Sequence, residues 1–225
     1  MPLTGFSQVW DLIWSDEFDS NYLDQSKWTH EIGTGSQFNM WGWGNGELQY
    51  YQPQNSIVSN GSLKIIAKQE TQALVDSWNN TYYYSSSRIS TKDNFNFKYG
   101  KVEARIKTLD GEGFWPAFWL LPKDGQWPCD GEIDIMEQWG RDIPTDETTG
   151  AAHIGSCANT YSNFKNFQTF SSSNYSSNFH IYSIIWEEDY IAWYVDGNKV
   201  FQVTPASFPT IPNQHSWPFN SNNWY

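Results

Sequence analysis

Glu132-Ile133-Asp134-Ile135-Met136-Glu137 is the stretch that decides the fold, and it breaks a spacing rule. Isoleucines alternate with acids, which predicts a β-strand, and in a regular strand side chains at i, i+2 and i+4 share one face. Glu132 and Asp134 obey this rule, whereas Glu137 has the wrong parity. One extra residue, a β-bulge at Ile135-Met136, would return Glu137 to the face of the other two acids. The stretch therefore predicts three carboxyl groups on one face.

Carboxyl groups held this close repel one another when ionised, so their pKa values must separate. Such a site keeps one acid protonated and another ionised at the same pH, which cleavage of a glycosidic bond requires. Two other interpretations stay open on these residues alone. The acids can be the solvated face of an amphipathic strand, or the oxygen ligands of a cation.

Strand patterns dominate the rest of the chain, and no segment has the spacing of an amphipathic helix. These patterns occupy residues 63–67, 102–107, 179–187, 191–195 and 199–203. Asp196-Gly197 predicts a tight hairpin turn between the last two of them. Many short strands separated by turn residues predict an all-β sandwich or jelly roll, with residues 1–225 forming a single domain.

Composition narrows the function classes. The chain has 13 Lys+Arg against 25 Asp+Glu, a formal net charge of -12, which argues against nucleic acid and anionic membranes as partners. No apolar run is long enough to span a membrane, and the first residues lack the pattern of a signal peptide. Aromatic residues make up 18% of the chain, which fits a groove where sugar rings stack. Cys129 and Cys157 form either one disulfide or two buried thiols.

Tryptophans precede the acidic strand. Trp115, Ala117 and Trp119 share one face of a predicted strand, and the small Ala117 leaves room for a ligand between the two indoles. Trp127 lies in a loop just before the acids, where it either stacks on a sugar or closes the core. Core packing is the alternative for Trp115 and Trp119 as well.

Three polar residues elsewhere are further candidates. Asn45 lies in a Gly/Trp-rich loop, and its amide suits sugar hydroxyls, although Asn-Gly is also a common turn sequence. Arg88 is a lone cation in an apolar-aromatic strand, where it binds a sugar or pairs with an acid. His153 lies on the strand expected after the acids, where it either is structural or hydrogen-bonds one of them.

Together these motifs resemble glycoside hydrolase family 16 in its laminarinase form. They are WGNGELQYY at residues 43–51, WPAFWL at 115–120, GEIDIMEQWG at 131–140, FHIY at 179–182 and WYVDG at 193–197. The resemblance covers nearly the whole chain. It implies a β-jelly roll of two curved antiparallel sheets with a concave substrate cleft, and endo-hydrolysis of β-1,3-glucan with retention of anomeric configuration.

The resemblance also implies roles for individual residues. Glu132 resembles the nucleophile, Glu137 the general acid/base, and Asp134 the residue that tunes their protonation. His153 matches the family position beside the acids, and Trp115 matches a position that stacks on the sugar. Asn45 and Arg88 match positions that contact the sugar. This chemistry requires no cofactor.

The extra residue Met136 carries substrate information within the family. Members that cut mixed-linkage β-1,3-1,4-glucan strictly tend to have the unbulged form, whereas the bulged form is typical of laminarinases and also of agarases and carrageenases. A chain with a net charge of -12 and few cations near the motifs would repel the negatively charged sulfate groups of sulfated galactans. We therefore expect β-1,3-glucan as substrate, with some mixed-linkage glucan tolerated. A non-catalytic glucan-binding module and a structural calcium-binding sandwich are the competing hypotheses.

One departure from the family concerns the end of the chain. The family pattern continues with further strands, whereas this sequence stops at Tyr225. We expect a truncated catalytic domain, monomeric unless a neighbouring molecule's strand fills the gap. Family members often hold a structural Ca²⁺ near positions matching Glu17 and Gly61, through backbone oxygen, and the missing strand puts this ion in doubt. The family also implies a secreted protein.

Overall fold

The protein is described by a computed structural model covering residues 9–109, 111–140, 147–171, 175–210, 217–220 and 223–225. Its contacts divide it into two compact units, one formed by residues 1–10 and 97–225 and the other by residues 11–96. The described residues form strands and short 3-10 turns without an α-helix, as the sequence predicts. No helix among them is long and apolar enough to cross a membrane.

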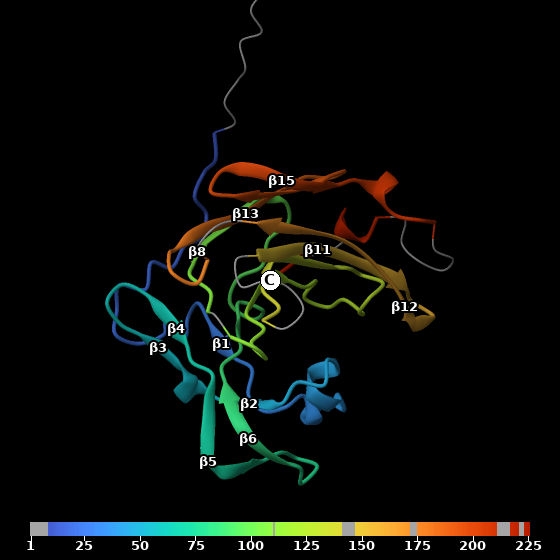
Figure 1. Ribbon diagram of the computed structural model, residues 1–225. Coiled ribbons are helices and arrows are strands. Elements are labelled where there is room, and N and C mark those ends of the chain that lie inside the picture. The colour runs from blue at the N-terminus through green and yellow to red at the C-terminus, as the bar shows by residue number, and fades with distance from the viewer. Residues whose placement is uncertain (1–8, 110, 141–146, 172–174, 211–216, 221–222) are drawn as a thin grey trace, which may run out of the picture. The chain divides into compact units, whose positions relative to one another are not determined.

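The first sheet of the larger unit carries the acidic stretch. It comprises β9 (Ala117–Leu120), β10 (Glu132–Glu137), β11 (Glu147–Ser156) and β12 (Asn159–Ser171), in the spatial order β12-β11-β10-β9. Figure 1 labels β11 and β12 of this sheet. All neighbouring pairs are antiparallel. The acidic strand is therefore an inner strand, held on both sides.

The second sheet of this unit confirms the strand patterns expected in its sequence. It comprises β8 (Gly100–Ile106), β13 (His180–Trp186), β14 (Ile191–Val195) and β15 (Asn198–Val203), in the spatial order β15-β14-β13-β8 and again antiparallel. Exposure alternates along β8 as the sequence predicts. Asp196 and Gly197 both have positive φ, 50° and 76°, which is the backbone that a two-residue hairpin turn requires.

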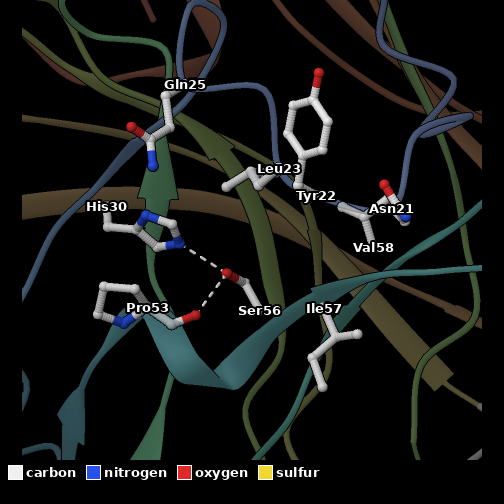
Figure 2. Close-up of a pocket in the computed structure, with 9 residues that line it drawn as sticks. All are labelled: Asn21, Tyr22, Leu23, Gln25, His30, Pro53, Ser56, Ile57 and Val58. Carbon is white, nitrogen blue, oxygen red and sulfur yellow. Dashed lines mark hydrogen bonds between the residues drawn. The ribbon is translucent and has the colours of Figure 1, made fainter.

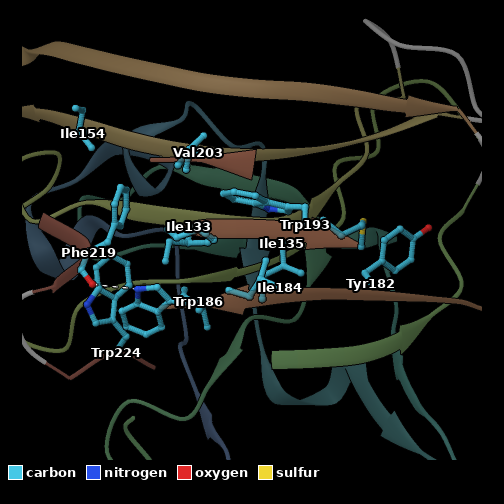
Figure 3. Packing of buried hydrophobic residues seen from close by; sticks show 14 of the residues in the cluster. Ile133, Ile135, Ile154, Tyr182, Ile184, Trp186, Trp193, Val203, Phe219 and Trp224 are labelled. Atoms are coloured by element: carbon cyan, nitrogen blue, oxygen red, sulfur yellow. Dashed lines mark hydrogen bonds between the residues drawn. The ribbon is translucent and has the colours of Figure 1, made fainter. Parts of the chain in front are cut away.

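The core of the unit lies between these two sheets. Figure 3 shows Ile133 and Ile135 of β10 packed among Ile184 and Trp186 of β13 and Trp193 of β14. These side chains are no more than 1% exposed. The Trp193 indole Nε1 also donates a hydrogen bond to the Asp134 carbonyl oxygen at 2.8 Å. Two antiparallel sheets packed face to face match the predicted jelly roll.

The last residues of the chain are part of this core. Trp224 is fully buried and forms isolated β-bridges with Phe97 and Pro122. Its backbone exchanges two hydrogen bonds with Phe97, at 2.8 and 3.0 Å, and Tyr225 exchanges two with Leu121, at 3.0 and 3.2 Å. The terminal segment thus joins the strand region before β8 to the segment that follows β9.

The smaller unit is built from short strands. Its elements are β1 (Thr29–His30), β2 (Gln49–Tyr51), β3 (Ser56–Val58), β4 (Leu63–Ile65), β5 (Lys68–Val75), β6 (Thr81–Ser86) and β7 (Ile89–Ser90). They pair as β1-β7, β3-β4 and the three-stranded β2-β6-β5. The β2-β6 pair is parallel, in contrast to the two antiparallel sheets of the larger unit.

A surface pocket of about 560 Å³ lies within this smaller unit (Figure 2). His30 Nε2 lies 2.7 Å from the Ser56 hydroxyl, which itself donates to the Pro53 carbonyl oxygen at 3.0 Å. Leu23, Ile57 and Val58 are among the apolar residues of the lining. None of the residues predicted for catalysis or sugar binding lines this pocket.

Candidate active site

The β-bulge predicted in the acidic strand is present. Against β11, the pairing shifts between Asp134 and Glu137, and against β9 it shifts between Asp134 and Met136. Ile135 and Met136 are both 1% exposed, so two consecutive side chains turn into the core at the bulge. Glu137 pairs with Thr149 of β11 and Asp134 with Ala151, two residues away, so Glu137 returns to the face that carries Glu132 and Asp134.

Glu132, Asp134 and His153 form one compact cluster. His153 lies directly opposite Glu132 in the β10-β11 pairing, and paired residues point to the same face of a sheet. Its Nε2 atom is 3.0 Å from Asp134 Oδ2. One ligand-type atom from each of the three residues lies within 4.8 Å of the others. His153 thus has the predicted place beside the acids, with Asp134 as its partner.

Burial dominates the electrostatics of Glu132. It raises the pKa of Glu132, and the neighbouring Asp134 charge raises it further, to about 8. The hydrogen bond from Trp127, and a positive charge on His153 when this residue is protonated, act in the opposite direction. A protonated Glu132 donates a hydrogen bond to Asp134, which favours the neutral form of Glu132 and adds to the rise of its pKa.

Glu137 is held by the tryptophan that precedes β9. Trp115 Nε1 donates a hydrogen bond to Glu137 Oε1 at 2.8 Å. The Trp115 ring lies against the Trp139 ring, with centroids 4.4 Å apart and planes inclined by 30°. Trp115 is nevertheless 41% exposed, which excludes the core interpretation and leaves ring surface open to a ligand.

Trp127 touches the other glutamate. Its Nε1 atom donates a hydrogen bond to Glu132 Oε2 at 2.5 Å, and the side chain is 42% exposed. The prediction that Trp127 closes the core is therefore wrong. Sequence reasoning expected this residue near the site and missed the contact, because a loop gives no periodicity from which to orient a side chain.

Comparison with known proteins identifies the family that has this arrangement of acids and tryptophans. The family model described as "Glycosyl hydrolases family 16" matches residues 46–224. The chain belongs to glycosyl hydrolase family 16. Its matched region includes Glu132, Asp134, Glu137 and the tryptophans that hold them.

Individual proteins resemble it over most of its length. It is 41% identical to glucan endo-1,3-beta-glucosidase A1 of Niallia circulans over 93% of this chain, and 34% identical to the beta-glucanase of Rhodothermus marinus over 94%. It spans only 32% and 72% of the lengths of those two proteins. The laminarinase catalytic domain of Thermotoga maritima MSB8 superposes with a TM-score of 0.82 at 37% identity, covering 96% of this chain and 85% of that domain.

β9 completes the acid-bearing face in this family 16 chain. Ala117 lies opposite Glu137, and Trp119 lies opposite Asp134. Both β9 residues therefore point to the face of the acids, as the alternation predicts. Ala117 is exposed, and Trp119 is half-buried. Trp119 is accordingly a wall of the site and not an interior core residue.

Asn45 and Arg88 belong to the smaller unit and have partners there. Asn45 Nδ2 donates to Glu47 Oε1 at 3.1 Å. Arg88 forms an ion pair with Glu31, and its guanidinium lies 4.4 Å from the centre of the Trp43 ring. Of the two interpretations of Arg88, pairing with an acid is confirmed, and sugar contact by Asn45 or Arg88 stays a prediction.

The predicted calcium ligands lie in two segments of the smaller unit. Glu17 and Gly61 are both exposed, and Gly61 has a φ of +65° in the turn between β3 and β4. Among the described residues, no cluster of three or more His, Cys, Asp or Glu side chains includes Glu17. A calcium ion at their backbone oxygens therefore stays a prediction from the family alone.

Proposed function

We propose that this chain is an endo-acting, retaining glycoside hydrolase that cleaves β-1,3-glucan. The observation that carries the proposal is the bulged strand β10, which turns Glu132 and Glu137 to one face while a tryptophan N–H binds each of them. A retaining reaction needs two carboxyl groups on the same side of the scissile bond, about 5–5.5 Å apart. The two curated relatives named above are called a glucan endo-1,3-beta-glucosidase and a beta-glucanase, which supports the substrate class.

Under this proposal, the two glutamates divide the two steps of the reaction as the family resemblance implies. Glu132 attacks the anomeric carbon, forming a glycosyl ester, while Glu137 gives its proton to the departing sugar oxygen. Glu137, now ionised, takes a proton from water, which releases Glu132. Glu132 must lose its proton before it attacks, and Asp134, which accepts a hydrogen bond from the protonated Glu132, is the group placed to take the proton up.

Mixed-linkage β-1,3-1,4-glucan is a second substrate under this proposal. The bulged form of the acidic strand is typical of laminarinases in this family, whereas enzymes strictly specific for mixed-linkage glucan tend to have the unbulged form. Galactans form the alternative substrate class, and the net charge of -12 disfavours their sulfated members. A comparison of laminarin, lichenan, agarose and carrageenan separates these classes.

Reducing-sugar release from laminarin tests the activity itself. We expect Glu132→Ala and Glu137→Ala to lose about three orders of magnitude or more of activity. Glu103→Gln is the matched control, because Glu103 is an exposed acid on β8 and a surface ion pair with Lys101 contributes little. A folded wild-type protein that binds laminarin without cleaving it would instead be a glucan-binding module.

Azide separates the two roles. In Glu132→Ala, azide can replace the missing nucleophile in a single displacement and give an α-glycosyl azide. In Glu137→Ala, azide attacks the glycosyl-enzyme and gives a β-glycosyl azide. The opposite pairing of variants and products would reverse the assignment, and an initial α-anomer from the wild type, detected by NMR, would refute retention.

The proposal extends to the location of the enzyme, its oligomeric state and its calcium binding. We infer an extracellular location, which the Cys129–Cys157 disulfide supports because such bonds persist in oxidising compartments. We also infer a monomer, which sedimentation velocity tests against strand exchange. Calcium at Glu17 and Gly61 would be structural and takes no part in the reaction, and a melting temperature unchanged by EDTA would argue against it.

A further inference from the structure

A disulfide joins the loop before the acidic strand to the sheet that carries the acids. Cys129 lies in the loop that connects β9 to β10, and Cys157 follows the last residue of β11. Their Cα atoms are 4.8 Å apart, and Cys129 is 3% exposed. Gln126 Nε2 donates a hydrogen bond to the Cys157 carbonyl oxygen at 3.4 Å. The loop therefore contacts Cys157, at the end of β11, through both the disulfide and this hydrogen bond.

The same loop carries Trp127, two residues before Cys129. Backbone bonds from Asp130 to the Gln126 carbonyl, at 2.9 Å, and from Gly131 to the Pro128 carbonyl, at 3.2 Å, fold the loop upon itself. They shape the loop without attaching it to the strand beside it. The disulfide supplies such an attachment next to the indole that binds Glu132.

We propose that the Cys129–Cys157 disulfide is a positioning device for catalysis, which holds the Trp127 N–H on the carboxylate of Glu132. An indole that is 42% exposed on a loop has many alternative rotamers, and fixing the backbone nearby reduces the entropy lost on forming its hydrogen bond. The two cysteines thus act through Trp127 and do not touch the reacting atoms. The inference rests on Glu132 being the nucleophile of the proposed reaction.

The consequence lies in the ionisation of Glu132. Four groups share its face or bind it: Asp134 and Glu137 on β10, His153 on β11, and the Trp127 N–H from the loop. From β9, Trp119 lies opposite Asp134 and does not titrate. Asp130 of the loop accepts a hydrogen bond from the Gln126 backbone N–H at 2.7 Å. The Trp127 bond favours ionised Glu132, so its loss raises the pH at which the nucleophile forms.

The test compares oxidised and reduced protein, and Cys129→Ser/Cys157→Ser as a reagent-free equivalent. Dithiothreitol gives the bridge two electrons and two protons, leaving two thiols and its own cyclic disulfide. We expect kcat on laminari-oligosaccharides to fall about tenfold, the loss of one hydrogen bond to a charged group. The acid limb of the pH profile should move upward by about one unit, with KM little changed.

Trp127→Phe separates positioning from general support of the fold. This variant keeps the ring and removes the N–H, so it should reproduce both changes in the oxidised protein. Reduction of Trp127→Phe should then add no further shift of the acid limb. An equal additional loss on reduction, or a wild-type acid limb that does not move, would overturn the proposal. Circular dichroism and measurement well below the melting temperature exclude unfolding as the cause.

A second readout does not depend on activity. The indole ¹H–¹⁵N resonance of Trp127, assigned by its absence in Trp127→Phe, should move on reduction if the hydrogen bond is released. A resonance that stays in place would refute positioning even in a protein that cleaves no glucan. Absence of hydrolysis by the oxidised wild type would instead refute the proposed function.

Discussion

At the scale of single residues, burial and function act on Glu132 in opposite directions. A nucleophile must be ionised, yet burial and Asp134 raise the pKa of Glu132 to about 8. His153 and the Trp127 N–H reduce this effect without removing it. Ionising Glu132 in the folded protein is therefore unfavourable, which is a common cost of active sites.

This conflict predicts a pH-dependent stability. Between the ordinary value of 4.5 and about 8, the folded protein keeps a proton on Glu132 that the unfolded chain releases. The contribution to stability is therefore full below pH 4.5 and is lost as the pH rises toward 8. Between pH 5 and pH 8 the wild type should therefore lose about 3–4 kcal/mol of stability relative to Glu132→Gln, which never ionises.

Urea denaturation of both proteins at the two pH values measures this difference. Glu103→Gln on β8 is the control, because its exposed carboxyl group should give the same difference from the wild type at both pH values. A difference between the wild type and Glu132→Gln that is the same at both pH values would show that Glu132 is ionised without strain in the folded state.

At the scale of elements, the bulge in β10 controls where Glu137 points. Deleting Met136 leaves three acids in strict alternation, still on one face. Inserting one Ala after Met136 either turns Glu137 to the opposite face, if the bulge is kept, or moves it one pleat position farther from Glu132, if the bulge is lost. We expect the insertion to abolish hydrolysis. The deletion should keep activity, shift preference from laminarin toward lichenan, and cost about 2–5 kcal/mol, because a buried Met side chain is lost from the core.

Relative rates on laminarin and lichenan, with urea denaturation of each variant, measure these effects. Inactivity of both variants alike would mean that any change in strand register destroys the site, and the bulge would then carry no information about linkage preference.

The strands and turns also show which structural features can be predicted from the sequence. Parity within 132–137 predicts the bulge, and Asp196-Gly197 predicts its hairpin, because both signals lie within a few residues. Spacing does not reveal which strands become neighbours, so the sequence cannot choose between a Cys129–Cys157 disulfide and two thiols, or between an acid and a sugar as the partner of Arg88. The bond from Trp127 to Glu132 cannot be predicted either, because a loop gives no periodicity from which to orient a side chain.

At the scale of the whole molecule, the family match and the contact pattern divide the chain differently. The family model spans residues 46–224 and so includes parts of both compact units. The acids, their tryptophans and the disulfide all belong to the larger unit, while Asn45, Arg88 and the predicted calcium ligands belong to the smaller one. The prediction of one domain over residues 1–225 thus has its natural test in whether the chain unfolds in a single transition.

The C-terminal segment offers the last prediction. Trp224 is 0% exposed, bridges Phe97 and Pro122, and packs against Trp186 and Phe219 with ring centroids 5.4 and 5.7 Å away. Trp224→Ala should therefore cost about 3–5 kcal/mol, since the cavity lies in the middle of the core.

Urea denaturation measures this cost, with Trp78→Ala as control. Trp78 is 41% exposed in the smaller unit, and its truncation should cost well under half as much. Because Trp224 and Phe219 pack against Gly131, immediately before Glu132, Trp224→Ala should also lower activity in the protein that remains folded. A Trp224→Ala protein as stable as Trp78→Ala would mean that the last residues are not an integral part of the core.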